Sequence, residues 1–225
     1  MNDYILRKLL LDAIVPIPFQ EVTKILECAY GQSQIFKELD NFGETVSLGQ
    51  VHFGKLNDGT EVAVKIQYPE IVSKVKPTLD IMEWLPKAHS NAKWDFKIYD
   101  YRDVFLQKFS EEFDNRIEIK HQMQYRKMLS PLGRIIIPEV IEDLCRPYIL
   151  VQKREEGFGL DMAETMVSAQ KIAMGHLLLE HFFYMLFRHG FVHGDLQPLN
   201  FSFRQYKKDY FVLILYNFGS VLKIP

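Results

Sequence analysis

The chain has 225 residues, of which 48% are hydrophobic and 25% charged, a composition typical of a globular protein that can bury a core. Its 27 Lys and Arg against 29 Asp and Glu give a net charge of −2, so it lacks the basic excess that a nucleic-acid partner requires, and we expect no such partner. Cys28 and Cys145 lie far apart without a CxxC motif, which indicates a reducing compartment rather than a disulfide framework or a zinc site.

Two apolar stretches bear on targeting and membrane insertion. Residues 1–18 contain an apolar run but no small-residue cleavage site, so we interpret them as a helix rather than a signal peptide. Residues 176–187 are interrupted by Glu180 and His181 and are too short to cross a bilayer. We therefore expect no transmembrane segment in this chain.

The next part of the chain predicts a short helix followed by a β-hairpin. Residues 18–28 begin with a proline and then place apolar side chains at helical spacing. Further on, apolar and polar residues alternate on both sides of the Asn-Asp-Gly turn at 57–59, which is the pattern of a hairpin. The apolar positions of this hairpin are Val51, Phe53, Leu56, Val62, Val64 and Ile66.

The rest of the chain alternates helical and extended patterns. Apolar residues recur at near-helical intervals through residues 101–129, which predicts one long helix or two. Residues 134–143 and 146–152 predict two strands, which complete a sheet of about five strands. The chain is then helical to His189, and residues 210–225 predict a hairpin-like pair of strands around a Phe-Gly turn. This succession of elements is that of a protein kinase.

The stretch FVHGDLQPLNF, residues 191–201, places reactive side chains directly after the apolar helix. His193, Asp195 and Asn200 have the spacing of the kinase catalytic loop HRDxxxxN. A structural alternative stands beside it, because the HGD stretch forms a turn, Pro198 ends a helix and Asn200 caps whatever follows. The choice depends on finding the other parts of a kinase site.

A lysine on the second hairpin strand is one such part. Lys65 in EVAVKIQY matches the kinase VAIK strand, whose lysine contacts nucleotide phosphates and is held by a carboxylate from a helix. Glu111, Asp114 and Glu118 lie in the predicted helix and are candidates for that carboxylate. The alternatives are an exposed lysine and a solvated acidic helix face, and spacing alone does not choose between them.

Two kinase motifs are altered in this sequence. Asn217-Phe218-Gly219 occupies the place of the DFG motif, whose aspartate is an anionic ligand of magnesium. Asn217 offers one oxygen but no charge, and hard cations prefer carboxylates. In addition, no GxGxxG loop precedes the hairpin, and Gly43 and Gly49 alone are weak signals.

Together these stretches resemble the UbiB/ADCK (AarF-type) atypical kinase-like family, which is associated with ubiquinone biosynthesis in bacteria and mitochondria. The resemblance is carried by PIPFQEVTKILE, SLGQVHFGKLNDGTEVAVKIQYPEI, EEFDNRIE, IIIPEVIE and FVHGDLQPLNF. In that family an alanine-rich loop ending in a serine replaces the glycine-rich loop, and here Ser47 matches that serine although the alanines are absent. The family's ExD motif is matched by Glu112 and Asp114. The family's KxGQ motif is not found in this chain, which we expect to be either a naturally short member or a fragment.

The resemblance implies a division of labour among the matched residues. Glu118 is the partner of Lys65, Asp195 is the catalytic-loop acid, and Asn200 is a magnesium ligand. ATP and magnesium are the implied cofactors, with Asn200 and Asn217 as the metal ligands. Asp195 would orient or deprotonate a hydroxyl or water, and the backbone around Ser47 would cover the phosphates.

We further assign the adenine contacts to the hairpin and to the connection between the lobes. Val51 and Ala63 would form an apolar wall, and the segment from Val151 to Arg154 would supply backbone hydrogen bonds. Because Asn217 removes an anionic metal ligand, a rate penalty on the order of a hundredfold or more is expected. We therefore predict weak, metal-sensitive ATP binding with low or absent phosphotransfer.

The expected fold is α+β and protein-kinase-like. It is bilobed, with an N-lobe of antiparallel sheet plus helix and a short or truncated helical C-lobe. We expect a helical extension over residues 1–35, an N-lobe over 36–152 and a partial C-lobe over 153–225. By resemblance, the partners are a nucleotide and a lipid or quinone-precursor substrate or a biosynthetic complex. The location is cytoplasmic or on the mitochondrial matrix side, with peripheral membrane association left open. Two alternatives remain: a non-catalytic pseudokinase scaffold, and a small-molecule phosphotransferase of the aminoglycoside or choline kinase type, whose loop also reads HGDxxxxN.

Overall fold

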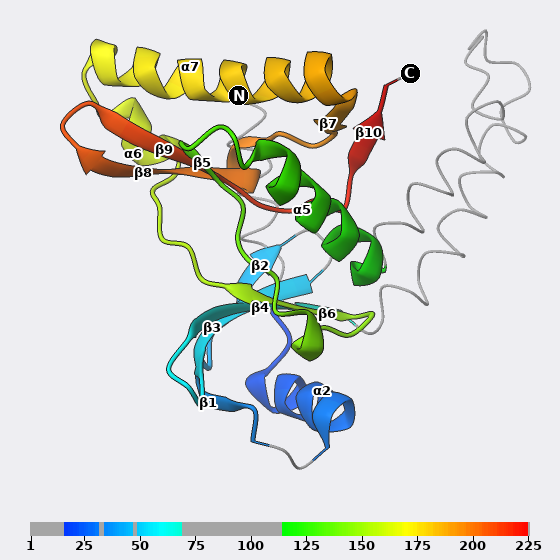
Figure 1. Ribbon diagram of the computed structural model, residues 1–225. Coiled ribbons are helices and arrows are strands. Elements are labelled where there is room, and N and C mark those ends of the chain that lie inside the picture. Colours follow the sequence, from blue (N-terminus) through cyan, green and yellow to red (C-terminus); the bar gives the residue numbers. More distant parts are fainter. Residues whose placement is uncertain (1–15, 32–33, 47–48, 69–113, 225) are drawn as a thin grey trace, which may run out of the picture.

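The computed structural model describes residues 16–31, 34–46, 49–68 and 114–224, and these form two lobes (Figure 1). The first lobe contains an antiparallel sheet and one helix that covers it. The second contains the longest helix and two smaller sheets, and a further helix crosses between the lobes (Figure 1). The α+β, kinase-like arrangement predicted from the sequence is confirmed.

The first lobe is built on a five-stranded sheet in which every pairing is antiparallel. The strand order is β1-β3-β4-β6, with β2 also paired to β3. The predicted hairpin is present as β3 and β4, joined by the turn at 57–59. The bounds of the strands are β1 Phe36–Leu39, β2 Glu44–Val46, β3 Gly49–Leu56, β4 Glu61–Gln67 and β6 Ile149–Lys153.

The two faces of β4 have different neighbours because side chains alternate along a strand. Val62, Val64 and Ile66 are fully buried in a cluster with the apolar face of helix α2, Phe19–Tyr30. This helix is the one predicted from residues 18–28. The intervening side chains, including Lys65, project from the opposite face of the sheet, where α5 lies.

Helix α5, Asn115–Leu129, links the two lobes. The Asp114 side chain caps it by accepting a hydrogen bond of 2.9 Å from the backbone N–H of Arg116. Its buried face includes Glu118 near the sheet, and further along Tyr125 and Leu129 in the core of the second lobe. The predicted helix over 101–129 is therefore present in its C-terminal half, while residues 101–113 lie outside the described residues.

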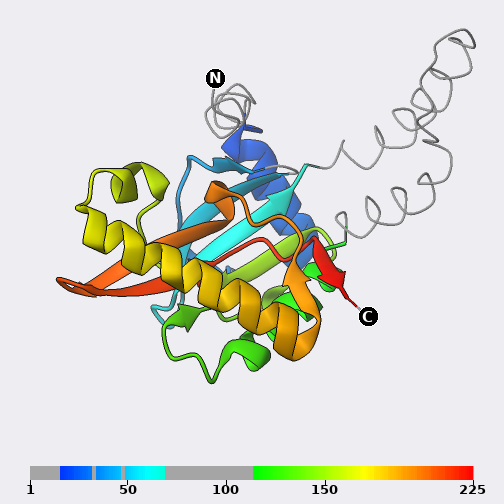
Figure 2. The ribbon, with the colours of Figure 1, turned by 90° about the horizontal axis from the view of Figure 1, so that it is seen from above.

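The second lobe packs a helical layer against two small sheets. Helix α7, Ser168–Tyr184, lies across the hairpin of β8, Phe201–Lys207, and β9, Tyr210–Leu215 (Figure 2). Strand β5, Ile135–Ile136, pairs in parallel with β9, while β7, Phe191–His193, pairs with β10, Val221–Lys223. The remaining elements are α6 Leu160–Glu164, the π-helical turn Met185–His189 and the 3₁₀ turns Glu142–Leu144 and Pro198–Asn200.

Two strand predictions were wrong in their pairing. Within 134–143 only Ile135 and Ile136 form a strand, and it joins β9 in the second lobe, whereas β1 and β2 complete the five-stranded sheet. Residues 210–225 do not form a hairpin: β9 pairs with β8, and β10 pairs with β7. Local alternation of apolar residues indicates extended chain but carries no information on the partner, which tertiary packing decides.

The π-helical turn Met185–His189, which follows α7, ends where the chain turns toward the catalytic-loop stretch. Gly190 has φ of 57°, a left-handed conformation that favours glycine, and its N–H caps the helix end at the carbonyl of Leu186. A Cβ at this position would also lie 2.6 Å from the carbonyl oxygen of Ile224. This turn places β7, and hence His193 and Asp195, beside the other elements of the site.

Within the described part of the chain, no helix has the length and apolar character needed to cross a membrane.

Candidate functional site

Lys65 and Glu118 form an ion pair between the first-lobe sheet and α5. The Lys65 Nζ atom lies 2.7 Å from Glu118 Oε2, and the two side chains are 15% and 4% exposed. The two residues are 53 positions apart in the sequence, so the contact depends on the docking of α5 against β4. The structure thus brings together the lysine and the carboxylate that the resemblance paired.

Burial makes this ion pair energetically demanding. Each charge loses its hydration, so the pair is favourable only while both partners are present. Gln67 Nε2 donates to Asn115 Oδ1 at 3.0 Å, and Gln122 Nε2 donates to Gln152 Oε1 at 2.6 Å. These two amide contacts lie on either side of Glu118 along α5 and hold the helix at a fixed depth against the sheet.

His193 fixes the start of the catalytic-loop stretch. Its Nε2 lies 2.9 Å from the carbonyl oxygen of Tyr216, which can only accept, so Nε2 carries the proton. Its Nδ1 then accepts the backbone N–H of Asp195 at 3.2 Å. Burial lowers the pKa of His193, which keeps the ring neutral and suits this pair of bonds. The histidine therefore positions the loop.

Asp195 and Asn200 are joined within the loop. Asn200 Nδ2 donates to the backbone carbonyl and to Oδ2 of Asp195, both at 2.8 Å, and Gln197 Nε2 donates to the same Oδ2 at 3.0 Å. Asn200 is only 6% exposed, whereas Asp195 is partly exposed. Within the described residues Oδ1 of Asp195 accepts no hydrogen bond, so it is the oxygen available to an incoming hydroxyl.

Asn217 connects the loop to the ion pair. Its Nδ2 donates to Asn200 Oδ1 at 3.2 Å, and its Oδ1 lies 3.5 Å from Lys65 Nζ, at the outer limit of a hydrogen bond. A continuous series of side-chain contacts therefore runs through Glu118, Lys65, Asn217, Asn200 and Asp195. We call these five residues the polar path. Every residue proposed from the sequence for catalysis or for metal binding lies on it.

The residues after Asn217 are anchored in the core. Phe218 is fully buried, with its ring centroid 5.0 Å from that of Tyr125 and 5.3 Å from that of His193. Its carbonyl oxygen lies 3.1 Å from Nδ1 of His121 on α5. Asn217 itself has φ of 60°, a left-handed conformation that asparagine adopts more readily than most residues. The position of Asn217 is thus set by its neighbour and by its own backbone.

The residues assigned to the adenine contacts fall on both faces of the sheet. Val51 pairs with Lys65 in the register of β3 and β4, and Ala63 lies two positions before Lys65 along β4, so both belong to the Lys65 face. Val151 instead pairs with Val64 and is fully buried in the cluster beneath α2. Its carbonyl accepts the N–H of Ile141 at 2.9 Å. The structure does not bring Val151 to the polar path.

Three of the residues named from the sequence cannot be placed. Ser47, Glu111 and Glu112 lie outside the described residues, so the phosphate-covering role of the backbone around Ser47 remains a prediction. Asp114, the other member of the matched ExD motif, acts as the helix cap of α5 and is bonded by the Arg116 guanidinium, which lowers its pKa.

Gln50 and His52 are buried polar residues whose role the sequence did not reveal. Gln50 Oε1 accepts the backbone N–H of Ile17 at 2.8 Å, and Gln50 Nε2 contacts His52 Nε2 at 2.7 Å. His52 Nδ1 in turn lies 2.7 Å from the carbonyl oxygen of Asp40. Both side chains are at most 1% exposed. The only signal in the sequence was the QVH stretch quoted in the resemblance, and its role here is to fasten three chain segments.

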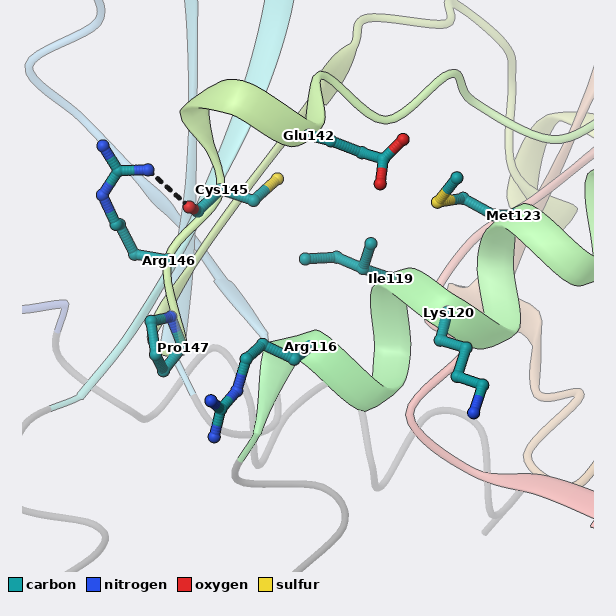
Figure 3. A pocket seen from close by; sticks show the side chains of 8 residues that line it. All are labelled: Arg116, Ile119, Lys120, Met123, Glu142, Cys145, Arg146 and Pro147. Atoms are coloured by element: carbon teal, nitrogen blue, oxygen red, sulfur yellow. Dashed lines mark hydrogen bonds between the residues drawn. The ribbon is translucent and has the colours of Figure 1, made fainter.

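A pocket of about 530 Å³ lies between α5 and the segment that leads into β6 (Figure 3), and Glu118 is not among its lining residues. One wall comes from α5 and the other from the segment that leads into β6. Its lining is apolar with three cationic groups and one carboxylate, and consists of Arg116, Ile119, Lys120, Met123, Glu142, Cys145, Arg146 and Pro147. It is separate from the polar path, and no sequence motif pointed to it.

Curated relatives match most of this chain but are much longer. The chain is 29% identical to the uncharacterized protein Rv0647c of Mycobacterium tuberculosis, an alignment covering 96% of this chain and 45% of the relative. It is 28% identical to the AarF domain-containing protein kinase 1 of Xenopus laevis, covering 84% of this chain and 37% of the relative. The chain therefore spans less than half the length of these relatives.

Solved structures match the arrangement of both lobes. A complex of Rv3197 with erythromycin from Mycobacterium tuberculosis superposes with a TM-score of 0.78 at 27% identity, covering 93% of this chain and 53% of that one. The Rio2 kinase of Chaetomium thermophilum, in a complex described as ADP/Mg²⁺-phosphoaspartate, gives a TM-score of 0.50 at 12% identity, covering 91% of this chain and 53% of that one. At that identity the Rio2 likeness shows the fold alone. The sequence model described as ABC1 atypical kinase-like domain matches residues 9–225, and the chain therefore belongs to the ABC1 atypical kinase-like family.

Proposed function

We propose that this chain is a nucleotide-binding kinase-like domain of the UbiB type, with weak or no phosphotransfer. The single observation that carries the proposal is the polar path, in which the buried Lys65–Glu118 ion pair continues through Asn217 and Asn200 to Asp195. A kinase-like site requires a lysine for the phosphates and a carboxylate for the acceptor within one constellation, and the path joins the two.

In this proposal each residue has a task set by its surroundings. Glu118 holds the Lys65 ammonium in place, and the ammonium binds the phosphates of ATP. Oδ1 of Asp195 accepts the proton of a hydroxyl or water, because its Oδ2 is occupied by Asn200 and Gln197. Val51 and Ala63 contribute the apolar surface for the base. The partly exposed Asp195 is within reach of an acceptor.

Magnesium was assigned to Asn200 and Asn217, and the donor atoms of this structure do not fit that ion. The Oδ1 atom of Asn200 already accepts a hydrogen bond from Asn217, and the Oδ1 atom of Asn217 faces the Lys65 ammonium. Both ligands are neutral, and magnesium prefers carboxylates. Among the described residues, no group of three or more His, Cys, Asp and Glu side chains is placed to hold a metal.

A non-catalytic role is the second candidate, and Asn217 favours it. An anionic group at this position is part of the charge neutralisation on which phosphoryl transfer depends. Without it, the same fold can serve as a regulatory or scaffold module of a lipid-biosynthetic complex, in the cytoplasm or on the matrix side of mitochondria. By the family resemblance, the substrate or partner beside the nucleotide would be a lipid or a quinone precursor, or a biosynthetic complex.

Thermal unfolding in the presence of ATP tests nucleotide binding. We expect millimolar ATP to raise the Tm, since a ligand at about 100 times its Kd stabilises the folded state by about 2.7 kcal/mol. Lys65→Met should abolish most of that rise. The matched control is Lys55→Met in the neighbouring strand, whose side chain is exposed near the hairpin turn and pairs loosely with Glu61 at 3.6 Å. An unchanged Tm of the unmodified chain at millimolar ATP would contradict the proposal.

A further inference from the structure

We infer that the side-chain amide of Asn217 takes the place of a divalent cation in this site, so that the chain binds the metal-free nucleotide. The inference rests on the proposed nucleotide binding and specifies the form of the ligand. It replaces the expectation of metal-sensitive binding that the sequence alone suggested.

The orientation of both amides is fixed by charged or polar partners. Asn200 Nδ2 donates to two oxygens of Asp195 at 2.8 Å, so its Oδ1 must point toward Asn217. Asn217 Oδ1 lies beside the Lys65 ammonium, which can only donate, so its Nδ2 must point toward Asn200. Exchanging O and N in either amide would place like groups against each other. The 3.2 Å contact between the two side chains is therefore an N–H···O hydrogen bond.

A carboxylate at position 217 cannot make the same contact. Its oxygens are acceptors only, so one of them would face the Oδ1 acceptor of Asn200 across a distance of about 3.2 Å. Two acceptors that face each other in this way repel, and a cation bound to both oxygens would offset the repulsion. The N–H of Asn217 supplies the positive end of a dipole at that point, so the two side chains are joined without an ion. We call this hydrogen bond between Asn217 and Asn200 the amide bridge.

Asparagine at 217 lessens the repulsion that a metal-free nucleotide meets in the polar path. The path has the carboxylates of Glu118 and Asp195 against the ammonium of Lys65, which is a net charge of −1. An aspartate at 217 would add a third carboxylate beside the phosphates, and its repulsion of the nucleotide would call for a cation. With asparagine at 217, this added repulsion is absent.

The bridge is also in place before any ligand arrives. Phe218 is fully buried against Tyr125 and His193, and His121 contacts its carbonyl, so the adjoining Asn217 is held by packing that involves no ion. A metal would have to break the bond between Asn217 and Asn200 to reach both oxygens. Binding of the metal complex is thereby disfavoured relative to the free nucleotide.

The test is isothermal titration calorimetry with ATP, in buffer containing either EDTA or excess magnesium chloride. For the unmodified chain we expect binding to be no tighter with excess magnesium than with EDTA, because magnesium takes up the free nucleotide and has no role in the site. For Asn217→Asp we expect binding to be about tenfold or more tighter with magnesium than with EDTA. Asn57→Asp is the matched control, because Asn57 is an exposed hairpin-turn residue whose Nδ2 donates to the carbonyl of Gln34. It should behave like the unmodified chain.

The outcomes separate the inference from the proposed function. Binding of the unmodified chain that is about threefold or more tighter with magnesium than with EDTA overturns the inference and leaves nucleotide binding standing. An Asn217→Asp variant whose nucleotide binding is the same with magnesium and with EDTA also overturns the inference. Absence of heat for the unmodified chain in both buffers, with its folding verified by circular dichroism, overturns the proposed function as well. If Asn217→Asp fails to fold, the comparison of buffers for the unmodified chain decides alone.

Discussion

Two contacts of the polar path differ in how they are held together. Between Lys65 and Glu118, a full positive and a full negative charge meet at 2.7 Å in the interior. Between Asn217 and Asn200, two neutral amides meet at 3.2 Å, and the charge that a kinase places at 217 is missing. In the proposed function, the lysine for the phosphates is kept while a hydrogen bond stands in the place of the metal ligands. The predictions below probe this contrast, beginning with the largest expected effect.

Removing the acid from the Lys65–Glu118 ion pair should lower the stability of the fold strongly. Glu118→Gln leaves the Lys65 ammonium buried without its counter-charge, and we expect the free energy of unfolding in urea to fall by about 3–5 kcal/mol. Glu21→Gln is the matched control, because Glu21 pairs with Lys24 at 2.7 Å on the exposed surface of α2. Such a pair contributes about 0–1 kcal/mol. An equal decrease in the free energy of unfolding of the two variants would contradict the predicted difference between the buried and the exposed ion pair.

The core beneath the catalytic loop should weaken in acid. Burial and the nearby His193 lower the pKa of His181 from 6.5 to about 4. Below pH 6.5 the unfolded chain binds a proton at His181 that the folded chain does not bind. The free energy of unfolding therefore falls as the pH drops from about 6.5 to about 4. The loss from this residue is roughly 3 kcal/mol, and His193, also lowered, adds to it.

Urea unfolding at a series of pH values measures this effect. His181→Leu should reduce the slope of the stability profile between pH 6.5 and 4, because only the contribution of His193 then remains. His176→Leu, at an exposed position of the same helix, should leave the profile unchanged. If His181→Leu retains the full slope, other groups cause the acid sensitivity.

A change at the Asn217–Asn200 contact gives the smallest expected change in stability. Asn217→Asp loses one partly buried hydrogen bond to Asn200, so we expect the free energy of unfolding without metal to fall by about 1 kcal/mol. Millimolar magnesium should restore this loss in the variant, by binding between the two oxygens, and leave the unmodified chain unchanged. A variant that is as stable in EDTA as the unmodified chain would show that the amide bridge contributes nothing to the fold.

Local sequence patterns predicted the elements that form through contacts between residues close together in the chain. The alternation around residues 57–59 was sufficient for β3 and β4, and helical spacing was sufficient for α2. Partners far apart in sequence were missed, because β5 pairs with β9 across more than seventy residues and adds only two residue pairs. The side of the sheet on which Val151 lies also required the register of β4 and β6.

The candidate site followed from spacing together with family resemblance, in unequal parts. The spacing of Asp195 and Asn200 marked the loop, but only the resemblance singled out Glu118 among the acids of its helix. What the sequence could not supply was the direction of each amide. Whether Asn217 presents its oxygen or its nitrogen to Asn200 depends on Lys65, which is 152 positions away.

The carboxamide of Gln50 has a consequence for the architecture of the first lobe. It is fully enclosed and bonds to the main chain of Ile17, a residue that precedes the sheet by about twenty positions. The start of α2 is thereby an integral component of the sheet and not an appendage. Any engineered version trimmed past Ile17 would strand a polar group in an apolar interior, so the folding unit has to be counted from before α2 and not from β1.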